Sequence, residues 1–172
     1  KLISANEKVR AIYRNEQNLE KVKKVFSFYT SDYHNLFEEI EWIEGDILDI
    51  PSLTNAFKGI TYVYHCAALV SFEPHKQHSL RKVNIEGTAN IVNFCLSNNI
   101  KKLCYVSSIA TLGSTLNNQP IDEKTIWNPE LDNNIYAITK YGAEMEVWRA
   151  TQEGLDAVIV NPGVILGAGI WN

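Results

Sequence analysis

Apolar residues along the chain gather into short runs typical of strands and into longer stretches with helical spacing. The runs that predict strands are 9–13, 40–43, 61–68, 102–107 and 157–161. The stretches that predict helices are 16–26, 77–98 and 136–153, with a short helix opened by Pro51 and the end of a further helix at 1–5. Alternating strands and helices predict a doubly wound α/β fold whose parallel sheet is covered on both faces.

Two of these segments carry specific burial predictions. The run 61–68 is apolar almost throughout, as in strands that are buried on both faces. In the helix expected at 136–153, four residues are spaced as one buried stripe, and Gly154 follows as the helix cap. The stripe consists of Ala137, Tyr141, Met145 and Trp148.

Composition and charge then narrow the class of protein. The chain has 172 residues, 45% of them hydrophobic, and a formal net charge of -4. This length predicts a single domain over 1–172 without a second one, and the apolar content excludes intrinsic disorder. The absence of a Lys/Arg block argues against nucleic acid or a membrane as partner, and no apolar run approaches the roughly 18 residues of a membrane span.

Cysteines and histidines suggest structural roles. Cys66, Cys95 and Cys104 lie in apolar contexts, which predicts reduced, buried thiols in a cytoplasmic protein and no metal site. His65 lies within an apolar strand, where a hydrogen-bonded core histidine is more common than a catalytic one.

Tyr136 and Lys140 are the first candidates for chemistry. Their spacing places the phenol and the ammonium on one face of the expected helix. A nearby cation lowers the pKa of a tyrosine toward the range of an acid/base catalyst. The pair alone is a weak signal, since an exposed Tyr and Lys on a surface helix is the plainer alternative. Ser107 and Ser108 add to it, because they end a strand at the sheet edge where α/β proteins bind ligands.

The blocks 105–108, 136–140 and 161–167 occur together as YVSS, YAITK and NPGVILG. With supporting blocks at 45–49, 64–68 and 83–88, this set resembles the extended short-chain dehydrogenases/reductases, also called the NAD-dependent epimerase/dehydratase family. The resemblance implies a Rossmann-type domain and an NAD(P)-dependent oxidoreductase that transfers hydride between nicotinamide and a small carbonyl or hydroxyl substrate.

The resemblance also implies roles for individual residues. Tyr136 would be the general acid/base, Lys140 would lower its pKa and hold the nicotinamide ribose, and Ser108 would be the catalytic serine. The remaining cofactor-binding positions implied by the family are Asp46, Ile47, Ala67, Ala68, Asn84, Val106, Ser107, Pro162, Gly163 and Val164.

Arg14 bears on the choice of cofactor. It follows the strand expected at 9–13, where NAD-specific relatives commonly carry an acidic residue for the ribose 2′-hydroxyl. An arginine there suits a 2′-phosphate, which favours NADP over NAD. The alternative is a solvated arginine after a strand.

The glycines suggest what this sequence lacks. The family begins with a strand and a Gly-rich turn for the cofactor diphosphate, yet the first glycine here is Gly45. We therefore expect this sequence to be a partial domain without the first strand, the Gly-rich turn and the C-terminal substrate region. Because that first strand is central in the order 3-2-1-4-5-6, its absence would split the sheet.

Three functions remain open at this point. The first is a reductase or dehydrogenase, and the second is a nucleotide-sugar epimerase of the same family. Dehydratases usually carry Asp-Glu after the strand-end serine, whereas Ile109 and Ala110 stand here, and the stretch looks closer to ketone- and steroid-type reductases. The third is a non-catalytic NAD(P)-binding sensor or scaffold. A homodimer is compatible with each of them.

Overall fold

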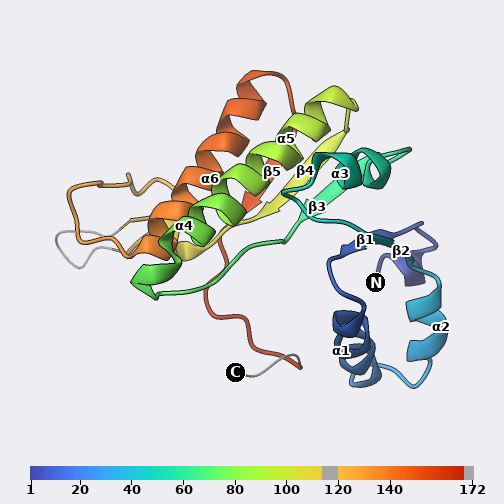
Figure 1. The fold of residues 1–172 in the computed structure, drawn as a ribbon. Helices are drawn as coiled ribbons and strands as arrows, with labels where there is room; N and C mark the ends of the chain where they lie inside the picture. Colours follow the sequence, from blue (N-terminus) through green and yellow to red (C-terminus); the bar gives the residue numbers. More distant parts are fainter. Residues whose placement is uncertain (114–119, 169–172) are drawn as a thin grey trace. The chain divides into compact units, whose positions relative to one another are not determined.

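The chain is an α/β protein with parallel strands, as the sequence predicts. The computed structural model describes residues 1–113 and 120–168. Its strands form two parallel sheets, β1 with β2, and β3, β4 and β5 in that order (Figure 1). The chain divides into two compact units, and each holds one sheet. Of the described residues, the first unit comprises 1–58 and 165–168, and the second comprises those within 59–164.

The first unit is built on two short strands, β1 (Arg10–Tyr13) and β2 (Glu41–Glu44). Its helical elements are η1 (Ile3–Ala5), α1 (Glu16–Ser27), α2 (Tyr33–Glu38) and α3 (Ile50–Ala56). Arg10 in β1 pairs with Glu41 in β2, and its Nη1 donates to the carbonyl of Ala56 at 2.9 Å. This arginine therefore ties the end of α3 to the small sheet. The sequence predicted no element at α2.

The second unit contains the three-stranded sheet of β3 (Tyr62–His65), β4 (Lys102–Val106) and β5 (Ala157–Val160). Its helical elements are η2 (Pro74–Lys76), α4 (Gln77–Leu80), η3 (Arg81–Glu86), α5 (Gly87–Ser97), η4 (Ile109–Thr111) and α6 (Ile135–Gln152). The η3 stretch is a π-helix that joins α4 to α5. The helix expected at 77–98 is thus present with a widened middle, a distortion often found near functional sites.

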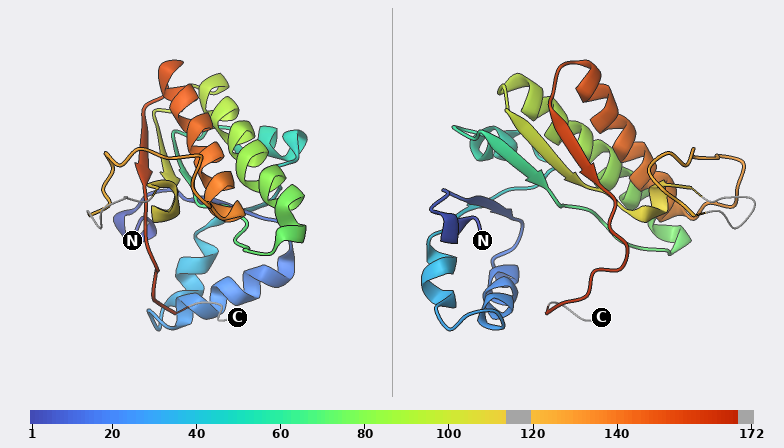
Figure 2. Two further views of the ribbon diagram at one scale, coloured as in Figure 1. Left: turned by 90° about the vertical axis from the view of Figure 1, so that its left-hand side faces the viewer. Right: turned by 180° about the vertical axis from the view of Figure 1, so that it is seen from behind.

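Helices α5 and α6 lie side by side on one face of this sheet (Figure 2). The core between these helices and the sheet includes Leu80, Val92, Cys95, Leu103, Tyr105 and Val147. In β3, His65 is buried, but Tyr62 and Tyr64 are 59% and 61% exposed. The prediction that 61–68 is buried on both faces is therefore wrong, because the strand alternates between a covered and an exposed face.

The buried face of α6 also differs from the predicted stripe. Ala137 is buried, but Met145 and Trp148 are 41% and 51% exposed. The residues that α6 buries are Ala137, Thr139, Lys140, Ala143, Glu144, Val147 and Ala150. Small and hydrogen-bonded polar residues let α6 approach its neighbours closely. At Gly142, an added Cβ would lie 2.7 Å from Ile85 Cδ1.

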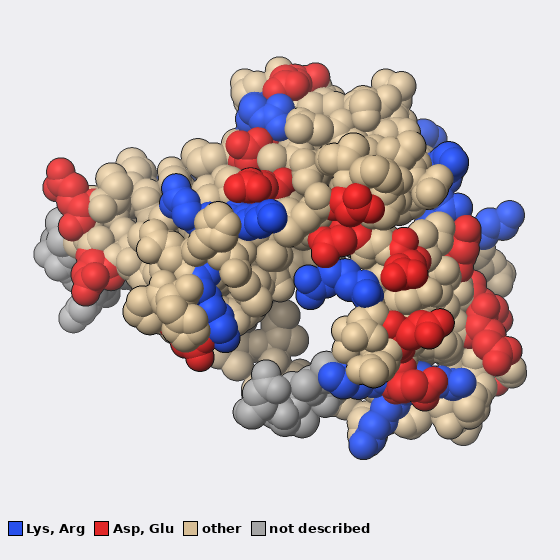
Figure 3. Space-filling view, in the orientation of Figure 1, with Lys and Arg blue, Asp and Glu red and all other residues tan. Residues whose placement is uncertain are grey.

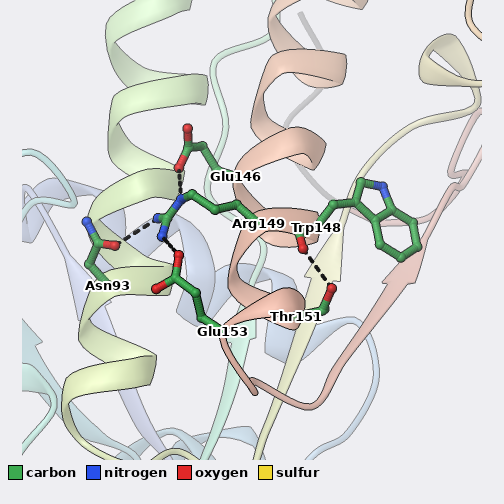
Figure 4. Close-up of polar contacts among 6 residues, drawn as sticks. All are labelled: Asn93, Glu146, Trp148, Arg149, Thr151 and Glu153. Atoms are coloured by element: carbon green, nitrogen blue, oxygen red, sulfur yellow. Dashed lines mark hydrogen bonds and ion pairs between the residues drawn. The ribbon is translucent and has the colours of Figure 1, made fainter.

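Arg149, near the C-terminal end of α6, links this helix to α5 by a hydrogen bond (Figure 4). Its Nη2 donates to Asn93 Oδ1 on α5 at 2.8 Å, and its Nε donates to Glu146 Oε2 at 3.0 Å. The helix ends as expected before Gly154, whose φ of 101° lies in the region that favours glycine. The helix that carries Tyr136 and Lys140 is therefore anchored near its C-terminal end.

The division into two sheets can be compared with the prediction that the family's first strand is missing from this sequence. In the family order, the predicted first strand would stand between the strands that correspond to β1 and β3. The strand pairing is interrupted between these same two strands. The missing strand itself stays a prediction.

Surface and thiol properties complete the fold. Basic and acidic side chains are intermixed over the face shown in Figure 3. Among the helices of residues 1–113 and 120–168, none combines the length and the apolar character needed to cross a bilayer. Cys95 is buried, but Cys66 is exposed, so the prediction of buried thiols is wrong for Cys66, which directly follows β3.

Candidate active site

Lys140 lies at the carboxyl end of β4 and is 1% exposed. Its Nζ donates to the backbone carbonyl of Val106 at 2.9 Å and to Tyr105 Oη at 2.7 Å. Burial lowers the pKa of Lys140 to about 8, while the nearby Glu144 carboxylate acts in the opposite direction. The side chain is therefore a buried cation held by β4, the strand that Ser107 and Ser108 follow.

Tyr136 lies one helical turn before Lys140, in the first turn of α6. Asn134 caps this helix by accepting from the Ala137 amide at 2.8 Å. The Tyr136 ring is half-buried and meets the ring of Phe72 edge-on, with centroids 5.7 Å apart. Phe72 itself is 65% exposed. An aromatic side chain from the loop after β3 thus lies directly against the candidate acid/base.

Ser108 follows β4 and caps the short helix η4. Its Oγ accepts from the Ala110 amide at 3.2 Å, and its carbonyl lies 2.8 Å from Thr111 Oγ1. Asn161 Nδ2, from the end of β5, lies 3.2 Å from the same carbonyl. The backbone of Ser108 is therefore held from two sides.

A buried carboxylate organises this turn. Glu144 is 6% exposed, and its Oε1 accepts from Thr111 Oγ1 at 2.6 Å and from Asn161 Nδ2 at 2.7 Å. Glu144 lies one turn after Lys140 on α6. One helix therefore positions the lysine and, through this network, the turn that carries Ser108.

Asn84, in the π-helical stretch η3, fixes the loop after β3. Its side chain makes two hydrogen bonds with the backbone of Leu69, at 2.8 and 3.0 Å, and its Nδ2 donates to Thr139 Oγ1 at 3.1 Å. Thr139 Oγ1 in turn donates to the carbonyl of Tyr136 at 3.0 Å. In this structure Asn84 connects the loop that bears Phe72 to the first turn of α6.

The other predicted cofactor residues of the second unit lie at strand ends. Ala67 and Ala68 are exposed after β3, and Pro162, Gly163 and Val164 follow β5. Val106 is half-buried and gives its carbonyl to Lys140. The Ser107 Oγ is buried, and by hydrogen-bond geometry no described residue satisfies it.

Arg14, Asp46 and Ile47 belong to the first unit. Arg14 and Asp46 border a hollow of about 330 Å³ that is also lined by Glu44, Gly45, Asp49 and Ser52. Asp46 Oδ1 accepts from the Leu48 amide at 2.9 Å. Arg14 Nη1 lies 3.9 Å from Asp46 Oδ2, and its side chain is 68% exposed.

Each unit, taken by itself, carries a feature that suits part of a nicotinamide dinucleotide. In the first unit, the exposed Arg14 guanidinium suits a phosphate. In the second unit, a Cβ added at Gly163 would meet Ile109 Cδ1 only at 3.6 Å, so space remains beside this backbone. No glycine precedes Gly45, so these residues include no Gly-rich turn for the diphosphate.

Two residues that sequence reasoning left without a role contact this site. Tyr105 is the hydrogen-bond partner of Lys140, and Glu144 holds Thr111 and Asn161. The spacing of Glu144 from Lys140 places both on one helix face, which is a signal that the sequence contained. His65 is confirmed as a core histidine, because it is buried with Nε2 2.9 Å from Thr88 Oγ1.

Curated relatives resemble this chain over much of its length. Dihydroflavonol 4-reductase of Medicago sativa is 26% identical over 169 residues, which are 92% of this chain and 76% of that sequence. Cinnamoyl-CoA reductase 1 of Petunia hybrida is 28% identical over 137 residues, which are 76% of this chain and 40% of that sequence. The chain spans less than half the length of several curated relatives that it matches.

Solved structures show the same fold. The thiolation-reductase di-domain of an archaeal non-ribosomal peptide synthetase superposes with a TM-score of 0.79 at 27% identity, covering 94% of this chain and 37% of that one. A short-chain dehydrogenase/reductase superfamily protein of Agrobacterium tumefaciens, solved with bound NAD, gives 0.73 at 21% identity, covering 93% of this chain and 43% of that one.

The family comparison covers the chain from end to end. The matching family is described as the NAD dependent epimerase/dehydratase family, and the match spans residues 1–172. Proteins of this family take NAD(P), and the relatives named above are reductases. The chain belongs to the NAD-dependent epimerase/dehydratase family, the extended short-chain dehydrogenases/reductases.

Proposed function

We propose that this chain is the cofactor-binding and catalytic part of an NAD(P)-dependent reductase or dehydrogenase that acts on a carbonyl or hydroxyl substrate. The observation that carries the proposal is the buried ammonium of Lys140, held at the carboxyl end of β4 one turn after Tyr136. When bound, the nicotinamide supplies or accepts the hydride. The family's NAD(P) dependence supports this assignment.

In this mechanism Tyr136 is the general acid/base. During reduction its phenol gives a proton to the substrate oxygen, and during oxidation it takes that proton back. Lys140 lies one turn after Tyr136 on the same helix, α6.

Ser108 would orient the substrate oxygen. Its Oγ already accepts from the Ala110 amide, so its own proton remains available for the substrate. The backbone of Ser108 is fixed by Thr111 and Asn161, which keeps the hydroxyl in place without reorganisation during the reaction.

The surroundings of Tyr136 favour a substrate with an apolar body. Phe72 lies against the Tyr136 ring, and both Phe72 and Val70 are more than 60% exposed. Relatives named dihydroflavonol 4-reductase and cinnamoyl-CoA reductase suggest dihydroflavonols and cinnamoyl-CoA as the first compounds to test. A nucleotide-sugar epimerase remains the second candidate because the family contains both activities.

The test is the Tyr136→Phe substitution in the full-length protein. We expect turnover of carbonyl substrates with NADPH or NADH to fall about 100- to 10,000-fold, while the Kd for cofactor stays unchanged. Tyr141→Phe is the matched control, because Tyr141 lies on the same helix and stacks on Trp127 at 4.5 Å. Full activity of Tyr136→Phe would contradict the assigned mechanism.

The same assay separates the three functions. A reductase consumes one NAD(P)H for each substrate reduced, whereas an epimerase converts a UDP-sugar without net change in cofactor. Cofactor binding without turnover of any carbonyl or UDP-sugar substrate would favour a sensor or scaffold.

A further inference from the structure

Tyr105 provides the side chain that directly binds the Lys140 ammonium. Lys140 Nζ donates to Tyr105 Oη at 2.7 Å and lies 4.4 Å from the centroid of the Tyr105 ring. Both side chains are 1% exposed. An ammonium has three N–H bonds, and here one is directed to the Tyr105 phenol and one to the Val106 carbonyl. Strand β4 therefore fixes two of the three donors of Lys140.

Titratable groups from three elements surround this pair. They are Glu144 and Tyr136 on α6 and His65 and Cys66 at the end of β3, with Cys104 on β4 next to Cys66. Burial and the charge of Lys140 lower the pKa of His65 to about 3, so His65 is neutral near pH 7. Burial raises the pKa of the Tyr105 phenol, which is therefore also neutral. Tyr105 is thus a neutral acceptor for a buried cation.

A buried cation is stable only where hydrogen bonds replace its lost hydration. Glu144 supplies negative charge, but its Oε1 already accepts from Thr111 and Asn161. The Tyr105 phenol supplies a direct hydrogen bond to the charged form of the amine. This bond both favours protonation of Lys140 and fixes the direction of the remaining N–H.

We propose that Tyr105 is a positioning residue of this active site, whose hydroxyl holds the Lys140 ammonium at the carboxyl end of β4 beside Ser108 and Tyr136. The inference rests on the proposed function for its catalytic meaning. The contact itself is independent of that function, because it is made within the core of one unit. Tyr105 acts through Lys140 and does not itself exchange a proton with the substrate.

The test is Tyr105→Phe in the full-length protein, which keeps the ring and removes only the hydroxyl. The pKa of Lys140 is followed by NMR titration of its ¹⁵Nζ signal, assigned with Lys140→Met. We expect this pKa to fall by about one unit from its value of about 8, because a hydrogen bond to the charged form is lost. The alkaline limb of kcat/KM should move to lower pH by a similar amount.

Tyr64→Phe is the matched control, since Tyr64 lies on the neighbouring strand β3 and is 61% exposed. Tyr64→Phe should leave both the NMR titration of Lys140 and the pH profile of kcat/KM unchanged. If Tyr105→Phe is folded and leaves the Lys140 titration unchanged, Tyr105 is only a core residue and the inference is wrong.

A measurement on the unmodified protein keeps the inference testable if the variant does not fold. The Lys140 ammonium should give a slowly exchanging ¹H–¹⁵N signal near pH 6, with a nuclear Overhauser contact to the Tyr105 ring. Its absence would overturn the inference. The NMR titration of Lys140 needs no turnover. Full activity of Tyr136→Phe would therefore refute the proposed function without deciding whether Tyr105 positions Lys140.

Discussion

The two regions that supply candidate cofactor contacts are built in opposite ways. In the second unit, Lys140 and Glu144 are buried charged residues whose polar atoms meet hydrogen-bond partners from β4, η4 and the end of β5. In the first unit, Arg14 is 68% exposed and its ion pair with Asp46 is 3.9 Å long. The candidate catalytic region is held by hydrogen bonds, whereas the Arg14 side chain is open to solvent.

This difference follows from what each region has to do. Acid/base chemistry depends on a fixed direction and a tuned pKa, and both require burial and specific partners. Discrimination of a phosphate requires mainly positive charge within reach, which a solvated arginine supplies. Substitutions should therefore affect stability and pH dependence in the second unit and affect cofactor preference in the first.

The largest effect should come from removing Glu144. In Glu144→Ala, Thr111 and Asn161 each lose one of their acceptors, and the buried Lys140 loses a nearby negative charge that raises its pKa. We expect the free energy of unfolding to fall by about 3 kcal/mol, measured by urea denaturation at pH 7. Glu86→Ala is the control, because Glu86 is exposed on η3. A loss below about 1 kcal/mol would show that the network adds little stability.

A smaller effect should come from His65. Its pKa in the folded protein is about 3, well below the ordinary 6.5, because it is buried near Lys140. Below pH 6.5 the unfolded chain therefore binds a proton that the folded chain does not, and stability falls with pH until about 3.

Between pH 6.5 and pH 5 this difference in proton binding amounts to about 2 kcal/mol. His65→Asn should remove most of that pH-dependent loss, whereas the exposed His78→Asn should retain it. Denaturant titrations at the two pH values measure the effect. If the free energy of unfolding falls equally from pH 6.5 to pH 5 in the original protein and in His65→Asn, His65 is not a buried neutral histidine.

The sequence predicts the elements of both regions better than it predicts what they bury. Within the described residues, apolar runs and helical spacing located β1 to β5 and the helix that bears Tyr136 and Lys140. The same spacing placed Met145 and Trp148 inside, yet α6 buries Lys140 and Glu144. Hydrophobic patterns treat charged residues as exposed, so they miss those whose hydrogen-bond partners come from distant strands.

Tyr105 and Arg14 illustrate which features can be predicted from the sequence and which cannot. Tyr105 stands in a strand-end block that the sequence singles out, but only the packing of α6 on β4 brings it to Lys140. Arg14 needs no such packing, because its place after β1 is enough to predict an exposed cation. Local features are therefore readable from the sequence, and contacts between distant segments are not.

The last and smallest effect tests the open region. In Arg14→Ala, loss of an exposed cation should weaken NADPH binding about tenfold, or about 1.4 kcal/mol, because one charge-assisted contact to the 2′-phosphate is removed. NADH binding should change little, since it carries no such phosphate. Fluorescence titration of both cofactors with the full-length protein measures the ratio. Lys21→Ala, an exposed cation on α1, should leave it unchanged. If Arg14→Ala weakens the binding of NADPH and NADH equally, Arg14 attracts both cofactors by its charge alone. If neither Kd changes, Arg14 is a solvated arginine without a role in cofactor binding.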